Sequence, residues 1–184
     1  MTQNKFADPR MSSVTRIVAI DPGSTGAIVL LDEGRISRIE SMPMGKIYGP
    51  TKKVWFPELL TMIDNMDPNL IVVEKVNATK NQGTTNSGAF MFGFAMNLAV
   101  GPAAGIPVFL LNSAEWKSYW GLSKSKKSQS TKKARAVFAD QSTFVNKHFK
   151  NLSSDHDKAE ACLMARYFWD IKRFTRNMEE DRLW

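Results

Sequence analysis

Two kinds of hydrophobic pattern alternate along this chain, one typical of strands and one typical of helices. Near the N-terminus, apolar runs at residues 16–20 and 27–31 flank the turn DPGSTG, and apolar and polar side chains alternate over residues 35–43. Such runs predict three β-strands, and their short connections predict that these strands pair as an antiparallel meander.

Helix and strand patterns then alternate to the end of the chain. In residues 56–66, the apolar side chains of Leu59, Leu60 and Ile63 fall on one face of a helix. The segments that follow are predicted to be a buried strand at 70–74, a Gly-, Asn- and Thr-rich loop at 77–88, a helix around 89–100, a strand at 106–111, a basic segment and two final helices. This order predicts an α/β fold with a mixed five-stranded sheet, three antiparallel strands followed by parallel strands, flanked by helices.

One stretch, residues 93–111, is apolar over nearly the length of a membrane span. Gly101, Pro102, Gly105 and Pro107 are expected to break a helix in the middle of this stretch. We therefore interpret it as a helix, a turn and a buried strand, and we expect no membrane partner.

Length and composition fit a single domain. The 184 residues, 43% of them hydrophobic, are enough to bury a sizeable core. We place the domain at residues 16–175, between an N-terminal tail at 1–15 and a C-terminal tail at 176–184. The single cysteine, Cys162, excludes an intrachain disulfide and is expected to be a packed thiol in a cytoplasmic protein.

The chain is basic, with a formal net charge of +7 and an isoelectric point near 9.6. This charge favours a polyanionic partner, either nucleic acid or a membrane surface. No acidic residue lies between Glu115 and Asp140, which favours a DNA-binding segment over a solubilising face or a disordered loop. The candidate DNA-binding residues are Lys117, Lys124, Lys126, Lys127, Lys132, Lys133 and Arg135, and a helical pattern turns the last three largely outward.

Four acidic residues stand where the predicted elements bring them together. Asp21 follows the first strand and Glu74 ends a buried one, while Asp157 and Glu160 are three residues apart on one face of the last helix. Carboxylates at close range cannot all stay ionised without a counter-charge. A hard divalent cation supplies it, so all four are candidate metal ligands and candidate catalytic residues. We expect two Mg²⁺ ions, with Mn²⁺ as a substitute, to promote phosphoryl chemistry on nucleic acid.

These acids also have structural interpretations. Asp21 fits an ordinary Asp-Pro-Gly turn, and Ser154 with Asp157 fits a capping box at the start of a helix. Capping does not account for the acid three residues after Asp157. Asp155 stays open as an alternative third ligand, and His156, between two acids, is a weak candidate for assisting the site.

The segments that carry the acids resemble those of a known family. IDPGSTGA, VVEKV and DHDKAEACLMARY look like the signature segments of RuvC-type Holliday junction resolvases, particularly the compact phage-encoded ones. The stretch from 81 to 117 is similar as well, so the resemblance spans residues 16–170. It implies an RNase H-like fold, which lies within the α/β class that the order of elements predicts.

The resemblance also implies a function. It points to a homodimeric, Mg²⁺-dependent endonuclease that cuts paired strands of a four-way DNA junction and leaves 5′ phosphates, in the cytoplasm of a bacterium or a phage-infected cell. By match of motif, Asp21, Glu74, Asp157 and Glu160 take the metal-binding places. The chain departs from the family's pattern at two positions: Glu160 stands where Asp is usual, and Asn77 stands where bacterial members place an aromatic residue at the junction centre.

Two other functions stay open at this point. DPGSTG resembles the phosphate loop of actin-like kinases and ATPases, which need a second domain of the same kind, and 184 residues leave no room for one. The other is a protein that binds DNA branches without cleaving them, which the retained carboxylates disfavour.

Overall fold

The computed structural model describes residues 14–47, 52–76, 84–123, 126–151 and 154–171. Its centre is a five-stranded sheet with the strand order β3-β2-β1-β6-β7. β2 pairs antiparallel with β1 and β3, whereas β6 pairs parallel with β1 and β7. The predicted sheet of three antiparallel strands followed by parallel strands is therefore confirmed. The strands are β1 (Arg16–Ile20), β2 (Ala27–Asp32), β3 (Arg35–Ser41), β6 (Leu70–Lys75) and β7 (Val108–Asn112).

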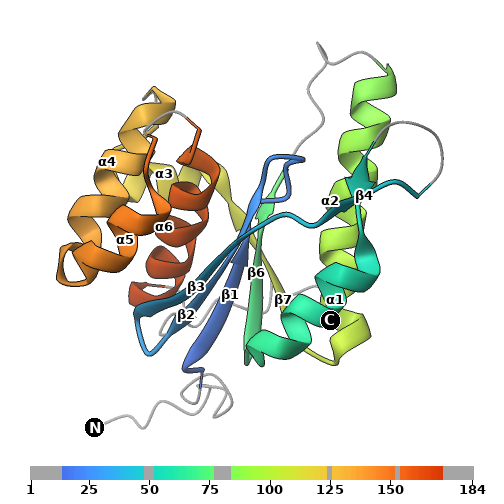
Figure 1. The fold of residues 1–184 in the computed structure, drawn as a ribbon, viewed down its shortest axis with the longest axis horizontal. Helices are drawn as coiled ribbons and strands as arrows, with labels where there is room; N and C mark the ends of the chain where they lie inside the picture. The colour runs from blue at the N-terminus through green and yellow to red at the C-terminus, as the bar shows by residue number, and fades with distance from the viewer. Residues whose placement is uncertain (1–13, 48–51, 77–83, 124–125, 152–153, 172–184) are drawn as a thin grey trace, which may run out of the picture.

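Helices cover both faces of this sheet (Figure 1). On one face lie α1 (Phe56–Met66) and α2 (Thr84–Ala104), and a small second sheet of β4 (Met44–Gly45) and β5 (Lys53–Val54) contacts α2. The other face carries α3 (Ser113–Tyr119), α4 (Lys127–Val137), the 3-10 helix η1 (Ala139–Gln141), α5 (Ser142–His148) and α6 (His156–Asp170).

The prediction of two final helices was wrong, because three α-helices, α4, α5 and α6, end the described chain. Phe138 follows α4 and Phe149 follows α5, and both side chains are fully buried. The chain turns at each of them to bring the ring into the core, and these turns separate α4 from α5 and α5 from α6.

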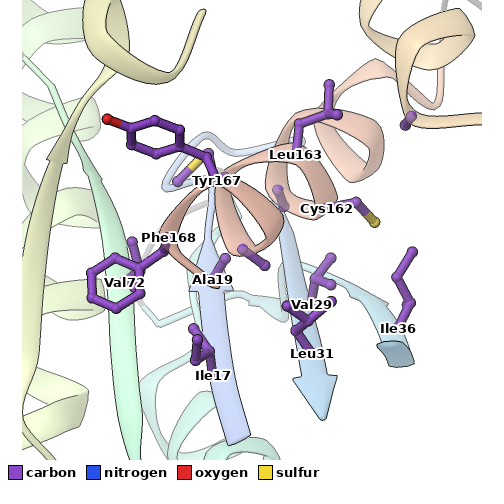
Figure 2. Packing of buried hydrophobic residues seen from close by; sticks show 14 of the residues in the cluster. Ile17, Ala19, Val29, Leu31, Ile36, Val72, Cys162, Leu163, Tyr167 and Phe168 are labelled. Atoms are coloured by element: carbon purple, nitrogen blue, oxygen red, sulfur yellow. The ribbon is translucent and has the colours of Figure 1, made fainter. Parts of the chain in front are cut away.

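Alternation of side chains along the strands produces two cores. Ile17 and Ala19 of β1 and Val72 of β6 face α6, whereas Val18 and Ile20 face α1 and α2. Figure 2 shows the first of these cores, with α6 packed over β1 and β2. Because α6 packs on the sheet, the N-terminal end of this helix has a fixed position relative to the ends of β1 and β6. The acids in the first turns of α6 are therefore fixed as well.

Cys162 belongs to the core beneath α6, as predicted. Its side chain is fully buried, and burial raises the pKa of its thiol, so the group stays protonated and unreactive near neutral pH.

α2 is longer than the sequence pattern predicted, and two expected helix breakers lie inside it. Pro102 removes one N–H donor of the helix, which then ends two residues later at Ala104. Gly101 is required there because a Cβ would lie 2.0 Å from the Cγ2 atom of Val108 on β7. The helix ends just before Gly105, whose φ of +69° favours glycine. No helix in the described part of the chain is long and apolar enough to cross a membrane.

Candidate active site

β1 and β6 end side by side, and each has an acidic residue at its end. Asp21 follows β1, and Glu74 is the second-last residue of β6. The parallel register of the two strands makes Asp21 and Glu74 neighbours at this end of the sheet. Alternation turns both side chains toward the face that α6 covers, since Ala19 and Val72, two residues earlier on each strand, lie in the core beneath that helix. The sheet itself therefore brings these two predicted site residues together.

The turn after β1 is tightly packed around its own backbone. The N–H of Gly23 donates to Oδ1 of Asp21 at 3.4 Å, and the N–H of Gly26 donates to the carbonyl of Gly23 at 2.8 Å. A Cβ on Gly26 would lie 2.0 Å from the backbone oxygen of Asp21. Gly26 therefore allows the turn to close and holds Asp21 at the rim of the sheet.

α6 brings two more acids to the same place. It begins at His156, so Asp157 lies in its first turn and Glu160 one turn further along the same face. The helix lies over β1 and β2, and the carboxylates of Asp157 and Glu160 both act electrostatically on Asp21. The structure thus brings together Asp21, Glu74, Asp157 and Glu160, the four acids singled out in the sequence.

A lysine from a third element lies among these acids. The ammonium Nζ of Lys117, on α3, is 3.1 Å from Oε2 of Glu160 and 3.8 Å from Oε1 of Glu74. The side chain of Lys117 is 31% exposed, compared with 12% for Glu74 and 15% for Glu160. A partly accessible cation therefore bridges an acid of the sheet and an acid of α6.

Two uncharged side chains also donate hydrogen bonds to the carboxylates of Glu74 and Glu160. Nε1 of Trp116 donates to Oε1 of Glu74 at 3.2 Å, and the hydroxyl of Ser130, on α4, donates to Oε1 of Glu160 at 2.8 Å. Trp116 and Ser130 are both buried. Because buried donors have few alternative orientations, they fix the direction in which each carboxylate points.

Burial and mutual repulsion perturb the acids strongly. Burial, followed by the charges of Glu74, Asp157 and Glu160, raises the pKa of Asp21 to about 8. Burial also raises the pKa of Glu74, although the charge of Lys117 opposes the shift. Burial alone would lower the pKa of Lys117, but the charges of Glu160 and Glu74 raise it overall. The cluster therefore carries more negative charge than its one lysine compensates.

The donors match a hard divalent cation in kind, since all four are carboxylates. Burial and the charges of the other three acids raise the pKa of Asp21 and keep it mainly protonated at neutral pH, and a bound cation would offset both effects. As placed, however, oxygens of Glu74 and Glu160 contact Lys117, Trp116 and Ser130, and Oδ1 of Asp157 contacts His156. Within the described ranges, no group of three or more His, Cys, Asp or Glu side chains is arranged so that it could hold a metal ion. Metal binding therefore requires some of these side chains to exchange partners.

Asp155 and His156 take different places around the cluster. Asp155 is the N-cap of α6 but makes no side-chain capping bond; its carboxylate accepts from the N–H of Asn151 and pairs with Lys158 at 3.4 Å. Nε2 of His156 lies 2.7 Å from Oδ1 of Asp157. The capping box with Ser154 is thus not formed, and Asp157, not Asp155, acts on Asp21.

The predicted DNA-binding residues separate into distinct groups. Lys126 and Lys132 are exposed and Lys133 is half-buried, but the guanidinium of Arg135 donates to the backbone carbonyl of Phe149. The prediction that Arg135 turns outward was wrong, because α4 packs on α6 and its neighbours and this side chain satisfies a carbonyl at the end of α5. Lys117 faces the acids. Lys124 and the side chain of Lys127 lie outside the described residues, as does Asn77.

Sequence reasoning missed three partners of the acids: Lys117, Trp116 and Ser130. The Trp-Lys pair in the helix after β7 was the available signal for the first two, whereas a serine in a basic helix gives none.

No protein-family model and no curated protein sequence matches the chain. Solved structures match its fold. Thermus thermophilus RuvC in complex with a Holliday junction substrate has a TM-score of 0.63 at 14% identity, covering 88% of this chain and 97% of that one. A second structure of Thermus thermophilus RuvC has a TM-score of 0.51 at 13% identity, covering 86% and 97%. The yeast mitochondrial Holliday junction resolvase Ydc2 has a TM-score of 0.46 at 12% identity, covering 95% and 94%. The RNase H-like fold implied by the sequence is therefore confirmed by the two RuvC structures.

Proposed function

We propose that this protein is a structure-specific endonuclease that cuts Holliday junctions and other branched DNA by metal-dependent hydrolysis of a phosphodiester. The observation that carries the proposal is the convergence of four acids from β1, β6 and α6 at one end of the sheet. It is supported by a fold shared with a RuvC structure that contains a Holliday junction substrate. The net charge of +7 suits a polyanionic substrate.

The residues that would hold the cation are Asp21, Glu74, Asp157 and Glu160. Mg²⁺, or Mn²⁺ in its place, would supply charge stabilisation to the attacking and leaving oxygens, with two ions as the expected number. Trp116 and Ser130 orient the carboxylates of Glu74 and Glu160. The contact of His156 with Asp157 restricts the third carboxylate in the same way.

The exposed lysines of α4 and its N-terminus are the proposed contacts to DNA phosphates. Lys126 and Lys132 are exposed, and α4 also carries Ser130, which binds Glu160. A single helix therefore connects a basic surface to an acid of the site. Contacts of this kind position the backbone of DNA and do not read its sequence.

We further propose a homodimer and products with 5′ phosphates. Two equivalent sites suit the two-fold symmetry of a four-way junction. The 21-residue helix α2 contains no charged residue and exposes Met91, Ala95 and Ala99, which makes it the candidate interface. Light scattering on the purified protein tests the dimer, since a monomer would have a mass of 20.7 kDa, and ligation of the cleaved products tests the phosphate.

The direct test of the function is one set of incubations. A labelled four-way junction, a linear duplex and a single strand of matching sequence are each incubated with the protein in Mg²⁺, in Mn²⁺ and in EDTA. We expect the junction to be cut with either cation, the duplex and single strand to survive, and EDTA to stop the reaction. Tight junction binding without cutting under any of these conditions would instead identify a branch-binding protein.

Changing both exposed lysines, Lys126→Gln with Lys132→Gln, is expected to weaken junction binding regardless of DNA sequence. Each lost phosphate contact should reduce the slope of log K against log salt by about 0.9 on duplex arms. Arg35→Gln is the control, because Arg35 is exposed at the far end of β2 and β3 from Asp21. An unchanged slope in the double variant, measured by fluorescence anisotropy across a salt series, would remove these residues from the interface.

A further inference from the structure

The position of Lys117 between Glu74 and Glu160 has a consequence for metal binding. Its ammonium contacts oxygens of two of the four acids that would hold the cation, at 3.8 and 3.1 Å. An ammonium ion and a divalent cation both bind through carboxylate oxygens, and they repel each other at close range. Lys117 and the cation therefore cannot both occupy these oxygens without a large penalty.

The fold itself places this lysine. α3 starts directly after β7, and its N-cap residue Asn112 pairs with Lys75, so the helix begins at the edge where β6 ends. The side chain of Asn112 accepts a hydrogen bond from the N–H of Ala114, which fixes the first turn. Trp116 is fully buried and anchors α3 on the sheet, and the Nζ atom of Lys117 lies 4.9 Å from its ring. The contact of Lys117 with the acids thus follows from the anchoring of α3.

The side chain of Lys117 is also free to leave. It is 31% exposed, whereas Glu74 and Glu160 are 12% and 15% exposed. A lysine has a flexible four-carbon stem and is strongly hydrated in water, so it can move its ammonium to solvent while α3 stays in place. The acids, held by Trp116 and Ser130, keep their direction when it does.

We propose that Lys117 is a built-in competitor of the divalent cation: it neutralises Glu74 and Glu160 in the absence of metal and must swing away for the metal to bind. This inference rests on the proposed function, because it concerns the same acids. Lys117 thereby keeps the acids from repelling one another and lowers the affinity of the site for metal. Cation binding and the release of Lys117 are one coupled step.

The test is calorimetric titration of Mn²⁺ into the DNA-free protein at a fixed pH. Lys117→Met is expected to bind Mn²⁺ about ten- to a hundredfold more tightly than the unchanged protein. In the unchanged protein, Mn²⁺ binding must break the charge-assisted hydrogen bond of Lys117, and the variant has no such bond to break. Lys117→Gln, which keeps a polar side chain without the charge, is expected to show the same direction of change and serves if the Met variant is poorly folded. Lys147→Met removes the same charge from an exposed position on α5 and is expected to bind as the unchanged protein does.

Asp21→Asn separates the two ways in which this test can fail. If Asp21→Asn abolishes Mn²⁺ binding but the Lys117 variants bind no more tightly than the unchanged protein, the competition is overturned and the metal site stands. If Asp21→Asn binds Mn²⁺ normally, the four acids are not the metal site and the proposed function itself is overturned. Thermal denaturation gives a second readout, since Mn²⁺ should raise the melting temperature of Lys117→Met more than that of the unchanged protein.

Discussion

Asp21→Asn and Glu74→Gln are each expected to lower the rate of junction cleavage by about a thousandfold or more, because a metal ion contributes several kcal/mol of transition-state stabilisation. Both changes replace a carboxylate by an amide of the same shape. The amide keeps one acceptor oxygen, so the contacts with Gly23 and with Trp116 can persist. What is lost is the negative charge that a divalent cation requires.

Junction binding by these two variants should stay within a few-fold of that of the unchanged protein, since neither acid contributes attraction to phosphate. Single-turnover cleavage in Mg²⁺ and anisotropy in EDTA measure the two quantities separately. Asp64→Asn is the matched control, because Asp64 is exposed on α1, on the face of the sheet opposite α6. Normal cleavage by both site variants would mean that the acids at the ends of β1 and β6 have no part in the chemistry.

The meeting of Asp21 and Glu74 was predictable from the sequence for a simple reason. Both follow apolar runs long enough to be buried strands, and neighbouring parallel strands end at the same edge of a sheet. The spacing of Asp157 and Glu160 likewise fixed their shared face on α6. These predictions depend only on local periodicity and on the order of elements, which a single sequence contains.

The partners of the acids were not predictable in the same way. Lys117 and Arg135 both lie in a segment without acids, and net charge alone assigned both to DNA. The structure instead places the first against Glu160 and turns the second to the carbonyl of Phe149. Which buried group a long basic side chain reaches depends on how α3 and α4 pack on the sheet and on α6. Such packing is long-range, and periodicity carries no information about it.

The length of α2 was also not predictable from local sequence patterns. Gly101 and Pro102 are helix breakers by local propensity, yet the helix continues to Ala104 because Gly101 lets it approach Val108 of β7 closely. Tertiary contact therefore outweighed propensity here. Gly105, at positive φ, was correctly expected to interrupt the helix.

Asp21→Asn is also expected to stabilise the folded protein at alkaline pH in the absence of divalent cations. The pKa of Asp21 is about 8 in the folded protein, above its ordinary value of 3.8, because of burial and the charges of Glu74, Asp157 and Glu160. Between about pH 4 and 8 the folded state therefore holds a proton that the unfolded state has lost. The free energy of unfolding falls as pH rises through this window, and the loss is complete above it. Asparagine does not titrate and avoids the loss.

The difference in unfolding free energy between Asp21→Asn and the unchanged protein should be small near pH 4 and reach about 3 to 5 kcal/mol at pH 9, with allowance for partial solvent screening. Urea denaturation in EDTA at pH 5, 7 and 9 measures it, with Asp64→Asn expected to follow the unchanged protein throughout. A difference independent of pH, or greater stability of the unchanged protein at pH 9, would contradict the raised pKa. Adding Mn²⁺ should stabilise the unchanged protein and leave Asp21→Asn unaffected, since a ligand stabilises only the state that binds it. Asp21, which the proposed reaction needs as a metal ligand, therefore destabilises the metal-free fold when it is ionised. A bound cation would remove this destabilisation and allow the reaction.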